Sequence, residues 1–308
     1  MSRIRIAMIG MGKIASDQHV PALARNDAFE LVAAASPHQR LEGVPNFKSL
    51  EALVEELAHL DAVALCTPPQ IRYQLARYAL EHGLHVLLEK PPGATLNEVS
   101  ALVELAEKKN VGLFAAWHSR EAAAVEPARR WLETRKISDV MVTWKEDVRF
   151  WHPGRAWIWK AGGLGVFDPA INALSILTEI LPGTLVLTDA KLTFPSNCET
   201  PVAGRVHLRN EFGTEVRMEL DFLQAGPPSW DIDIHTDAGR LLVSKGGSII
   251  KIGDGEPVEN PDNEYPNLYA HFEELVRNRA IDVDVAPLRL VADAFMCGRR
   301  TVTEPFVE

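Results

Sequence analysis

Cysteine is scarce in this chain. Only three cysteines occur among 308 residues, Cys66, Cys198 and Cys297, and none belongs to a C-x-x-C pair. Such a small number of cysteines argues against a disulfide framework and is typical of proteins in a reducing compartment. We therefore expect a cytoplasmic protein, and we expect no metal site. Cys66 follows a short apolar run, which indicates a small buried side chain.

Long hydrophobic runs and an excess of positive charge are also missing. No apolar stretch reaches the roughly 18 residues of a membrane span, and residues 2–6 lead into a strand without the apolar core of a signal peptide. The formal net charge is −10, with no basic stripe. We therefore expect neither a membrane nor a nucleic-acid partner. The 46% of hydrophobic and 24% of charged residues are ordinary for a globular protein with a substantial core.

The first 117 residues alternate between apolar runs and longer amphipathic segments. The pattern predicts strands at 4–9, 29–35, 62–66, 85–88 and 112–117. It predicts helices at 14–24, 50–60, 71–82 and 96–108. Regular alternation indicates parallel strands joined by right-handed crossovers. Residues 1–117 are thus predicted to form an α/β Rossmann domain, a doubly wound parallel sheet.

The pattern changes after Trp117. A strand is predicted at 140–148, and helices are predicted at 122–134, 168–181, 268–276 and 288–297. From residue 184 onward apolar and polar residues alternate in short runs, with a hairpin turn at 237–239. A period of two is typical of an antiparallel sheet with one covered face. We expect residues 118–308 to form an α+β domain with a large, mainly antiparallel open sheet, whose C-terminal helix is a candidate to pack back on the first domain.

A glycine-rich loop joins the first predicted strand to the first predicted helix. Gly10, Gly12 and Ala15 form a G-x-G-x-x-A pattern. Gly10 permits a tight turn, Gly12 lets the backbone approach a pyrophosphate, and Ala15 allows close packing of helix on sheet. The helix N-terminus favours the anion. This context predicts a dinucleotide site rather than a plain turn.

The acidic residue that usually binds the ribose after the second strand is absent. Ser36 and His38 stand there instead, followed by Arg40. A carboxylate would repel a 2′-phosphate, whereas a hydroxyl with nearby imidazole and guanidinium groups accepts one. We expect NADP to be used, alongside NAD.

Two further strands end in proline-containing steps. Thr67 and Pro68 follow the strand at 62–66 and should border the cofactor, because open α/β sheets bind ligands at the carboxyl ends of their strands. Thr67 is equally suited to cap the next helix. Glu89-Lys90-Pro91-Pro92 follows the strand at 85–88. Burying this charged pair costs desolvation free energy unless the pair faces a cleft. The alternative is a solvent-exposed loop at the end of the strand, which would have the same sequence pattern.

Aromatic and charged side chains crowd the predicted strand near residue 144. Alternation would place Trp144, Glu146 and Val148 on one strand face, with Trp151 and His152 following. Rings that stack on a C–H face and charged groups that bind hydroxyls suit a polyhydroxylated ligand. A half-buried strand with tryptophans in the core is the alternative.

Asp168 and Asn172 lie four residues apart at the start of a predicted helix and therefore share one face. Glycines at positions 162, 163 and 165 precede them and allow close approach to a ligand as readily as they make a flexible loop. Asp168 also reads as a plain helix N-cap.

Taken together, these motifs resemble the Gfo/Idh/MocA family of oxidoreductases over essentially the whole chain. The shared motifs are Gly10-x-Gly12-x-x-Ala15, Glu89-Lys90-Pro91, and Gly162-Gly163 leading to Asp168 and Asn172. Longer stretches are similar to the bacterial aldose 1-dehydrogenases that act on D-galactose and L-arabinose: 13–19, 89–95, 117–120, 144–148 and 163–175. The resemblance implies oxidation of the anomeric C1 of a pyranose to a lactone, with hydride transfer to NAD or NADP. Both sugars are candidates, because they differ by one hydroxymethyl group.

The resemblance also implies which residues form the site. Besides the residues named above, the cofactor would be bordered by Lys13, Ile14, Glu89, Lys90, Trp117 and His118. The sugar would contact Lys90, His118, Glu146, Trp151, His152, Asp168 and Asn172.

One position departs from the wider family. Many members place a histidine four residues after the aspartate, but Asn172 stands here and takes no proton. An anomeric hydroxyl is more acidic than an ordinary alcohol, so a weaker base suffices. We assign Asp168 as general base, Asn172 as the group that orients the sugar, and Lys90 as the cation that stabilises oxyanion charge. A desolvated, neutral Lys90 is the alternative base.

Two other functions remain open at this stage. One is an oxidoreductase acting on another sugar or polyol, and the other is a non-catalytic dinucleotide or sugar sensor, because this fold also hosts regulators. A sensor has no need of Lys90 together with Asp168. The resemblance further implies a homo-oligomer formed through the C-terminal sheet, whose exposed face would otherwise stay uncovered.

Overall fold

The chain folds into two units. The computed structural model describes residues 2–308. The first unit comprises the chain up to His118 together with Tyr265–Val285, and the second comprises Ser119–Glu264 and Ala286–Glu308. The second unit is thus interrupted by a segment that returns to the first, whereas the sequence predicted one continuous stretch from residue 118. The returning helix is α8 (Glu264–Asn278), and the last helix, α9 (Ala286–Cys297), belongs to the second unit.

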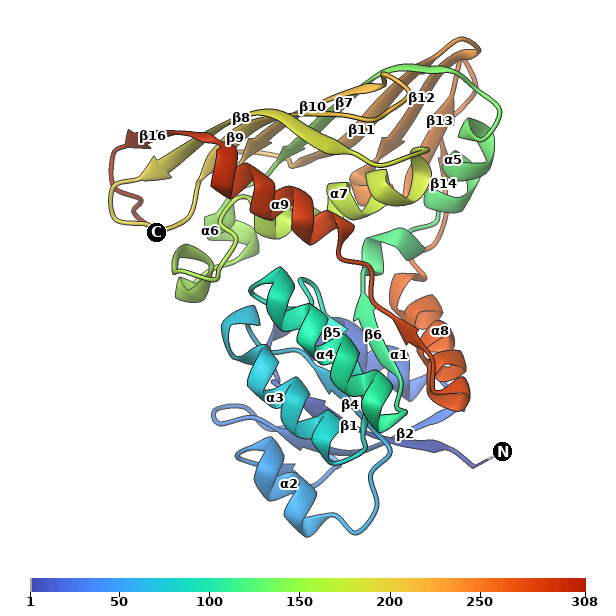
Figure 1. The fold of residues 1–308 in the computed structure, drawn as a ribbon, viewed down its shortest axis with the longest axis vertical. Helices are drawn as coiled ribbons and strands as arrows, with labels where there is room; N and C mark the ends of the chain where they lie inside the picture. Colours follow the sequence, from blue (N-terminus) through green and yellow to red (C-terminus); the bar gives the residue numbers. More distant parts are fainter. Residues whose placement is uncertain (1) are drawn as a thin grey trace. The chain divides into compact units, whose positions relative to one another are not determined.

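A seven-stranded sheet forms the centre of the first unit (Figure 1). The strand order is β15-β6-β5-β4-β1-β2-β3, and neighbouring strands pair in parallel throughout the described residues. The strands are β1 (Ile4–Ile9), β2 (Phe29–Ala35), β3 (Asn46–Phe47), β4 (Ala62–Leu65), β5 (His85–Glu89), β6 (Leu113–Ala116) and β15 (Ile281–Asp282). The strand order reverses between β1 and β4, which is the position where open α/β sheets bind their ligands.

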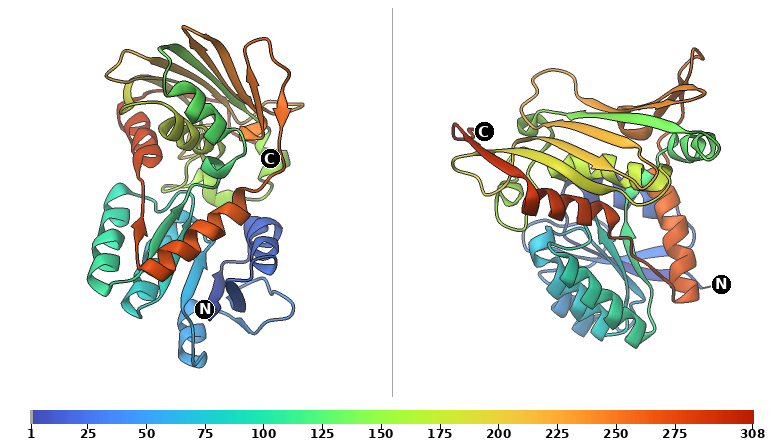
Figure 2. Two further views of the ribbon diagram at one scale, coloured as in Figure 1. Left: turned by 90° about the vertical axis from the view of Figure 1, so that its right-hand side faces the viewer. Right: turned by 45° about the horizontal axis from the view of Figure 1, so that its top comes forward.

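Helices cover both faces of this sheet (Figure 2). On one face pack α2 (Leu50–Glu56), α3 (Pro69–Glu81) and α4 (Leu96–Lys109). On the other pack α1 (Val20–Ala24) and α8. The central strands are therefore apolar on both sides, as a parallel sheet between two helical layers requires. The predicted doubly wound Rossmann sheet is confirmed.

The first helix is not regular. The sequence predicted one helix over 14–24, but the structure has a π-helical turn at Ala15–His19 before α1. Pro21 has no N–H, so it cannot donate the α-helical hydrogen bond to residue 17. Single π-turns of this kind are frequent at functional sites. His19, the last residue of the turn, is fully buried.

A nine-stranded sheet forms the second unit (Figure 1). Its order is β14-β13-β12-β11-β7-β10-β9-β8-β16. The strands are β7 (Ile137–Lys145), β8 (Val186–Pro195), β9 (Ala203–Arg209), β10 (Glu215–Asp221), β11 (Ser229–Thr236), β12 (Gly239–Ser244), β13 (Ile249–Ile252), β14 (Val258–Glu259) and β16 (Arg299–Thr303). The β7–β10 and β8–β16 pairs are parallel and the other pairs are antiparallel. The mainly antiparallel sheet and the hairpin at 237–239 are confirmed.

Three helices accompany this sheet. They are α5 (Val125–Leu132), α7 (Phe167–Ile180) and α9, and Figure 1 shows α7 and α9 lying along one face. Buried and exposed side chains alternate along β10, which is one of the strands of this sheet. The opposite face of the sheet carries the polar side chains, as an antiparallel sheet with one solvated face does.

The segment after β7 differs from its prediction. β7 ends at Lys145, Asp147 forms an isolated β-bridge with Leu223, and a short helix, α6 (Val148–Trp151), follows. The Asp147 carboxylate accepts a hydrogen bond from the Arg149 N–H at 3.0 Å and so starts this helix. The expectation that Glu146 and Val148 lie on a strand with Trp144 is therefore wrong, although all three are buried.

Candidate active site

The glycine-rich loop leaves β1 at the point where the strand order reverses. Gly10 has φ +88°, and a β-carbon there would lie 2.9 Å from Cγ2 of Thr67. A β-carbon at Gly12 would meet no atom within 4 Å, so the space beside this exposed backbone is open. A tight turn beside an open backbone fits a pyrophosphate at the start of the following helix.

Thr67 lies next to this loop, just beyond β4. Its hydroxyl Oγ1 is buried and has no hydrogen-bond partner among the described residues. Helix α3 has Pro68 at its N-cap and no side-chain cap, so the capping role predicted as the alternative for Thr67 is excluded. A buried hydroxyl without a partner at this sheet edge fits a polar ligand. Together with the glycine loop, it makes the first unit suited to a dinucleotide.

A buried arginine that no sequence motif predicts holds this edge together. Arg72 on α3 is 3% exposed, and its guanidinium donates to the carbonyl oxygens of Thr67, Glu89 and Pro91. These carbonyls belong to the exits of β4 and β5. One planar, always charged group therefore fixes both loops that carry predicted ligand contacts. No motif identifies this residue, because an arginine within a helix is normally predicted to lie on the protein surface.

Glu89 stands at the end of β5 inside a buried polar cluster. Its Oε1 accepts a hydrogen bond from the Tyr265 hydroxyl at 2.8 Å and lies 3.2 Å from Nε2 of His19. Its Oε2 accepts from the Lys90 N–H at 2.8 Å, and Nδ1 of His19 lies 2.8 Å from the Tyr269 hydroxyl. Glu89 therefore fixes the backbone that carries Lys90, with help from α8.

Charges in this cluster stabilise one another. Burial alone would raise the pKa of the Glu89 carboxyl, but the hydrogen bond and charge of His19, with His118 and Lys90, lower it to about 2. Burial alone would lower the pKa of His19, whereas Cys66, Tyr269 and Glu89 raise it well above its usual value of 6.5. The pKa of the acid is lowered and the pKa of the base is raised, so both shifts favour the charged forms and describe a buried ion pair.

The other residues predicted to border the cofactor lie at this edge or on its loops. Trp117 donates through Nε1 to the Asp284 carbonyl at 2.9 Å, and the His118 ring stacks on Tyr265 with centroids 5.4 Å apart. Ser36 accepts from the Gln39 N–H at 3.3 Å, and His38 is exposed. Lys13 forms an ion pair with Asp17, and Ile14 precedes the π-turn.

The second unit brings together most of the residues predicted to bind a sugar. Glu146 is 3% exposed and accepts hydrogen bonds from Nε1 of Trp230 at 2.8 Å and from His152, whose Nε2 lies 2.9 Å away. The Trp151 and Trp230 rings meet edge to face with centroids 4.9 Å apart. Trp230 comes from β11 and was missed, because nothing in the sequence links it to Glu146 before β7 and β11 pair.

Asp168 lies in the first turn of α7. The N-cap of this helix is Val166, without a side-chain cap, so the N-cap reading of Asp168 is excluded. Asp168 is 2% exposed, and its Oδ2 lies 3.8 Å from Nδ1 of His152. Asn172 follows one helical turn later and is half-buried. Asp168, His152 and Glu146 thus gather in one cluster.

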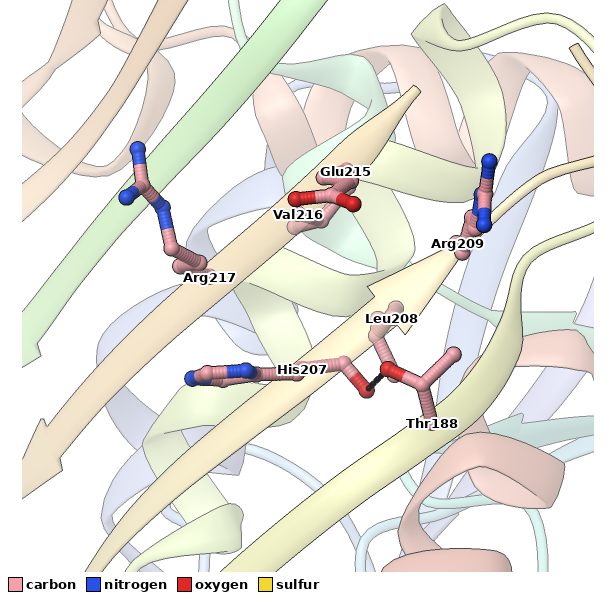
Figure 3. Close-up of a pocket in the computed structure, with 7 residues that line it drawn as sticks. All are labelled: Thr188, His207, Leu208, Arg209, Glu215, Val216 and Arg217. Atoms are coloured by element: carbon pink, nitrogen blue, oxygen red, sulfur yellow. Dashed lines mark hydrogen bonds between the residues drawn. The ribbon is translucent and has the colours of Figure 1, made fainter. Parts of the chain in front are cut away.

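A shallow pocket lies elsewhere on the nine-stranded sheet (Figure 3). It is lined by Thr188, His207, Leu208, Arg209, Glu215, Val216 and Arg217. The Thr188 hydroxyl donates to the His207 carbonyl at 3.1 Å across β8 and β9. None of the residues predicted for the site lines it.

Within residues 2–308, no group of three or more His, Cys, Asp or Glu side chains is arranged to hold a metal. No helix in this range has the length and apolar character to cross a bilayer.

Known proteins are similar to this chain in sequence and in fold. The profile of the Gfo/Idh/MocA family, described as an oxidoreductase family with an NAD-binding Rossmann fold, matches residues 4–116. A galactose 1-dehydrogenase from Pseudomonas fluorescens is 44% identical over 308 residues, which cover the whole of both chains. The chain belongs to the Gfo/Idh/MocA family of oxidoreductases. It is therefore an oxidoreductase, and its cofactor is a nicotinamide dinucleotide.

Solved structures of other proteins agree with the architecture. The crystal structure of a D-galactose-1-dehydrogenase protein from Rhizobium etli has a TM-score of 0.95 and 52% identity, covering 100% of this chain and 99% of that one. A 3-ketoreductase from Actinomadura kijaniata, solved with NADP, has a TM-score of 0.84 at 18% identity and covers 98% of this chain and 100% of that one. The second likeness concerns the fold alone.

Proposed function

We propose that the protein is an aldose 1-dehydrogenase that oxidises C1 of D-galactose, and of L-arabinose, to the lactone with NADP or NAD. The observation that carries the proposal is the buried cluster of Asp168, His152 and Glu146 beside two tryptophan rings. Carboxylates and an imidazole beside apolar rings suit a ligand with many hydroxyls and a C–H face. The full-length similarity to two galactose 1-dehydrogenases supports the same substrate class.

The first unit would hold the cofactor. Gly10 and Gly12 would border the pyrophosphate with the helix start at Lys13 and Ile14, and Thr67 and Pro68 would lie along the next strand exit. Ser36 and His38 would accept a 2′-phosphate, so we propose that NADP is used at least as well as NAD. The remaining contacts would come from Glu89, Lys90, Trp117 and His118. When bound, the nicotinamide supplies the acceptor for the hydride.

The protein's own side chains would manage the proton and the developing charge. Asp168 would take the proton of the anomeric hydroxyl, and Asn172 would orient the sugar. Lys90 would stabilise negative charge on the sugar oxygen, and the buried Glu89 holds the backbone that carries it. His118, Glu146, Trp151 and His152 would contact the ring and the other hydroxyls.

Steady-state kinetics test the function directly. D-galactose, L-arabinose, D-glucose and D-xylose should each be measured with NAD and NADP, following reduced cofactor by absorbance. We expect the highest kcat/KM with D-galactose or L-arabinose. The absence of sugar-dependent reduction for every aldose would favour the sensor, and activity on a polyol alone would favour the other oxidoreductase. A large preference for NAD would contradict the role of Ser36 and His38.

Two substitutions separate the assigned roles. Asp168→Asn should lower kcat at least about 10²-fold, because it removes the base. Lys90→Met should lower kcat by a similar factor, because it removes the charge opposite the oxyanion. Retention of most activity by Lys90→Met alone would reduce Lys90 to a positioning group. Near-normal rates in both variants would disprove the site. Asp233→Asn, which removes a half-buried carboxylate on β11 that is paired with Arg240, is the control.

A further inference from the structure

The hydrogen-bonding role of each atom in the Glu146 cluster can be assigned. The indole N–H of Trp230 only donates, so Oε2 of Glu146 accepts at 2.8 Å. Oε1 of the same carboxylate lies 2.9 Å from Nε2 of His152. An ionised carboxylate donates no hydrogen bond. His152 therefore carries a proton on Nε2, and in its neutral form Nδ1 has a free lone pair.

That lone pair faces a second carboxylate. Nδ1 of His152 is buried and has no hydrogen-bond partner among residues 2–308. It lies 3.8 Å from Oδ2 of Asp168. Two acceptors that face each other away from water repel unless an extra proton lies between them. A proton on either atom would turn this contact into a donor facing an acceptor.

We propose that His152 is a proton relay: it takes from Asp168 the proton that Asp168 removes from the sugar, and it keeps that proton until the product leaves the site. The inference rests on the proposed function, in which oxidation of a hydroxyl to a carbonyl releases one proton besides the hydride. The Asp168 carboxylate first takes the hydroxyl proton. Nδ1 of His152 then takes it from Asp168, which becomes a carboxylate again. No electrons move in this second step.

Burial and charge give the relay its direction. The Asp168 side chain is 3% exposed and the His152 side chain is 17% exposed, so a proton on the imidazole lies nearer to solvent than one on the carboxylate, although Nδ1 itself is buried. The imidazolium formed by the transfer is stabilised by Glu146, as an orienting carboxylate stabilises a histidine base. Asn172 cannot take this part, because an amide accepts no proton near neutral pH.

The distance of 3.8 Å is longer than a direct hydrogen bond. Transfer needs about 3 Å between the two heavy atoms or one bridging water, and catalytic hydrogen bonds commonly tighten only when substrate is bound. Protonation of Asp168 should shorten the distance between Oδ2 of Asp168 and Nδ1 of His152, because the carboxyl group then becomes a donor that faces an acceptor. The geometry thus assigns His152 a role in proton transfer in addition to its proposed contact with the sugar.

The variant His152→Gln tests the relay. Its side-chain amide can still donate to Glu146 but offers no basic nitrogen to Asp168. We expect kcat to fall about 10²-fold while the KM for the sugar stays within about threefold. Imidazole added to His152→Ala should restore part of kcat with a saturating dependence, which a purely structural role would not give. The control is His235→Gln, whose histidine lies 3.0 Å from Asp139 and 3.8 Å from Asp233 on the exposed sheet.

Other results would overturn the relay. If His152→Gln raises KM and leaves kcat unchanged, His152 holds a sugar hydroxyl. The ¹⁵N NMR signals of the neutral His152 imidazole in the wild-type protein should identify the Nε2–H tautomer, and an Nδ1–H tautomer would disprove the relay whether or not the variants fold. A wild-type protein that oxidises no aldose but shows the Nε2–H tautomer would contradict the proposed function and leave this hydrogen-bond assignment standing.

Discussion

Gly10 and Gly12 belong to one motif, but the structure gives them different tasks. Gly10 adopts a positive φ and packs against Thr67, so its lack of a side chain serves the fold. Gly12 has no such φ and no atom near the position of a β-carbon, so the protein alone does not require a glycine there. At the scale of the residue, we therefore expect Gly10 to serve the stability of the fold and Gly12 to serve ligand binding, although only one residue separates them.

Alanine substitutions should separate these two tasks. Gly10→Ala should lower the free energy of unfolding by about 1–3 kcal/mol through backbone strain and the contact with Thr67. Gly12→Ala should leave the free energy of unfolding unchanged but weaken NADP binding at least about tenfold, because its methyl group occupies the space left for the pyrophosphate. Urea unfolding and titration calorimetry measure the two quantities. Equal cofactor affinity in Gly12→Ala and wild type would place the dinucleotide elsewhere.

At the scale of the element, the end of β5 is held from two directions. The guanidinium of Arg72 on α3 binds the carbonyl oxygens of Glu89 and Pro91, and Tyr265 on α8 and His19 bind the Glu89 side chain. Helices on opposite faces of the sheet therefore meet at one strand end. A charged strand exit costs desolvation by itself, and here the Glu89 carboxylate and the Arg72 guanidinium both have close partners.

The buried ion pair of Glu89 and His19 should make the free energy of unfolding decrease both at acid pH and at higher pH. The pKa of Glu89 is lowered from 4.5 to about 2, so its stabilisation, about 3 kcal/mol, is present above pH 4.5 and is lost as the pH falls towards 2. The pKa of His19 is raised, so its contribution is complete below pH 6.5 and is lost as the pH rises through the higher value. We expect this cluster to stabilise the fold most between about pH 4.5 and 6.5.

Urea unfolding across this pH range checks the expectation. Glu89→Gln should flatten the loss of stability at acid pH, because the ionisable carboxyl is gone. Glu126→Gln is the matched control: hydrogen bonds from Arg129 and Arg130 also lower the pKa of Glu126 to about 2, but this pair lies in solvent. Water and salt screen it, so its removal should leave the acid limb unchanged. An acid limb that is the same in Glu89→Gln and wild type would contradict the buried ion pair.

At the scale of the whole molecule, the uncovered face of the nine-stranded sheet bears on assembly. Figure 3 shows polar and charged side chains standing on β9 and β10, among them His207, Arg209 and Arg217. Arg217 forms an ion pair with Asp139 at 2.9 Å on this face. Such a face needs no cover for solubility, so a partner copy would have to bind through polar contacts.

The homo-oligomer that the family resemblance implies should therefore associate through this sheet more weakly as salt rises. Sedimentation velocity at about 0.05 and about 0.5 M NaCl, where the Debye length differs about threefold, measures the effect. Arg217→Glu should favour the monomer, because it reverses a charge within the interface. Lys108→Glu, an exposed change on α4 in the first unit, is the control. A monomer at every concentration and salt level would contradict assembly through the sheet.

The sequence by itself determined the parallel sheet, the glycine loop and the candidate side chains. These depend on local signals: apolar runs, the position of Gly10 and Gly12, and the four-residue spacing of Asp168 and Asn172. Period-two alternation likewise determined that the second sheet is mainly antiparallel. Each of these signals lies within a few residues of the feature it predicts, so no tertiary information is needed to read it.

Only the tertiary structure decided which residues support the site. Tyr265 and His19 meet at Glu89 although 246 residues separate them in the sequence, and Trp230 reaches Glu146 because β11 pairs with β7. The strand predicted through Val148 ends at Lys145, since Asp147 starts a helix there. Contacts between distant segments follow from sheet order and register, and one sequence carries no local signal for them.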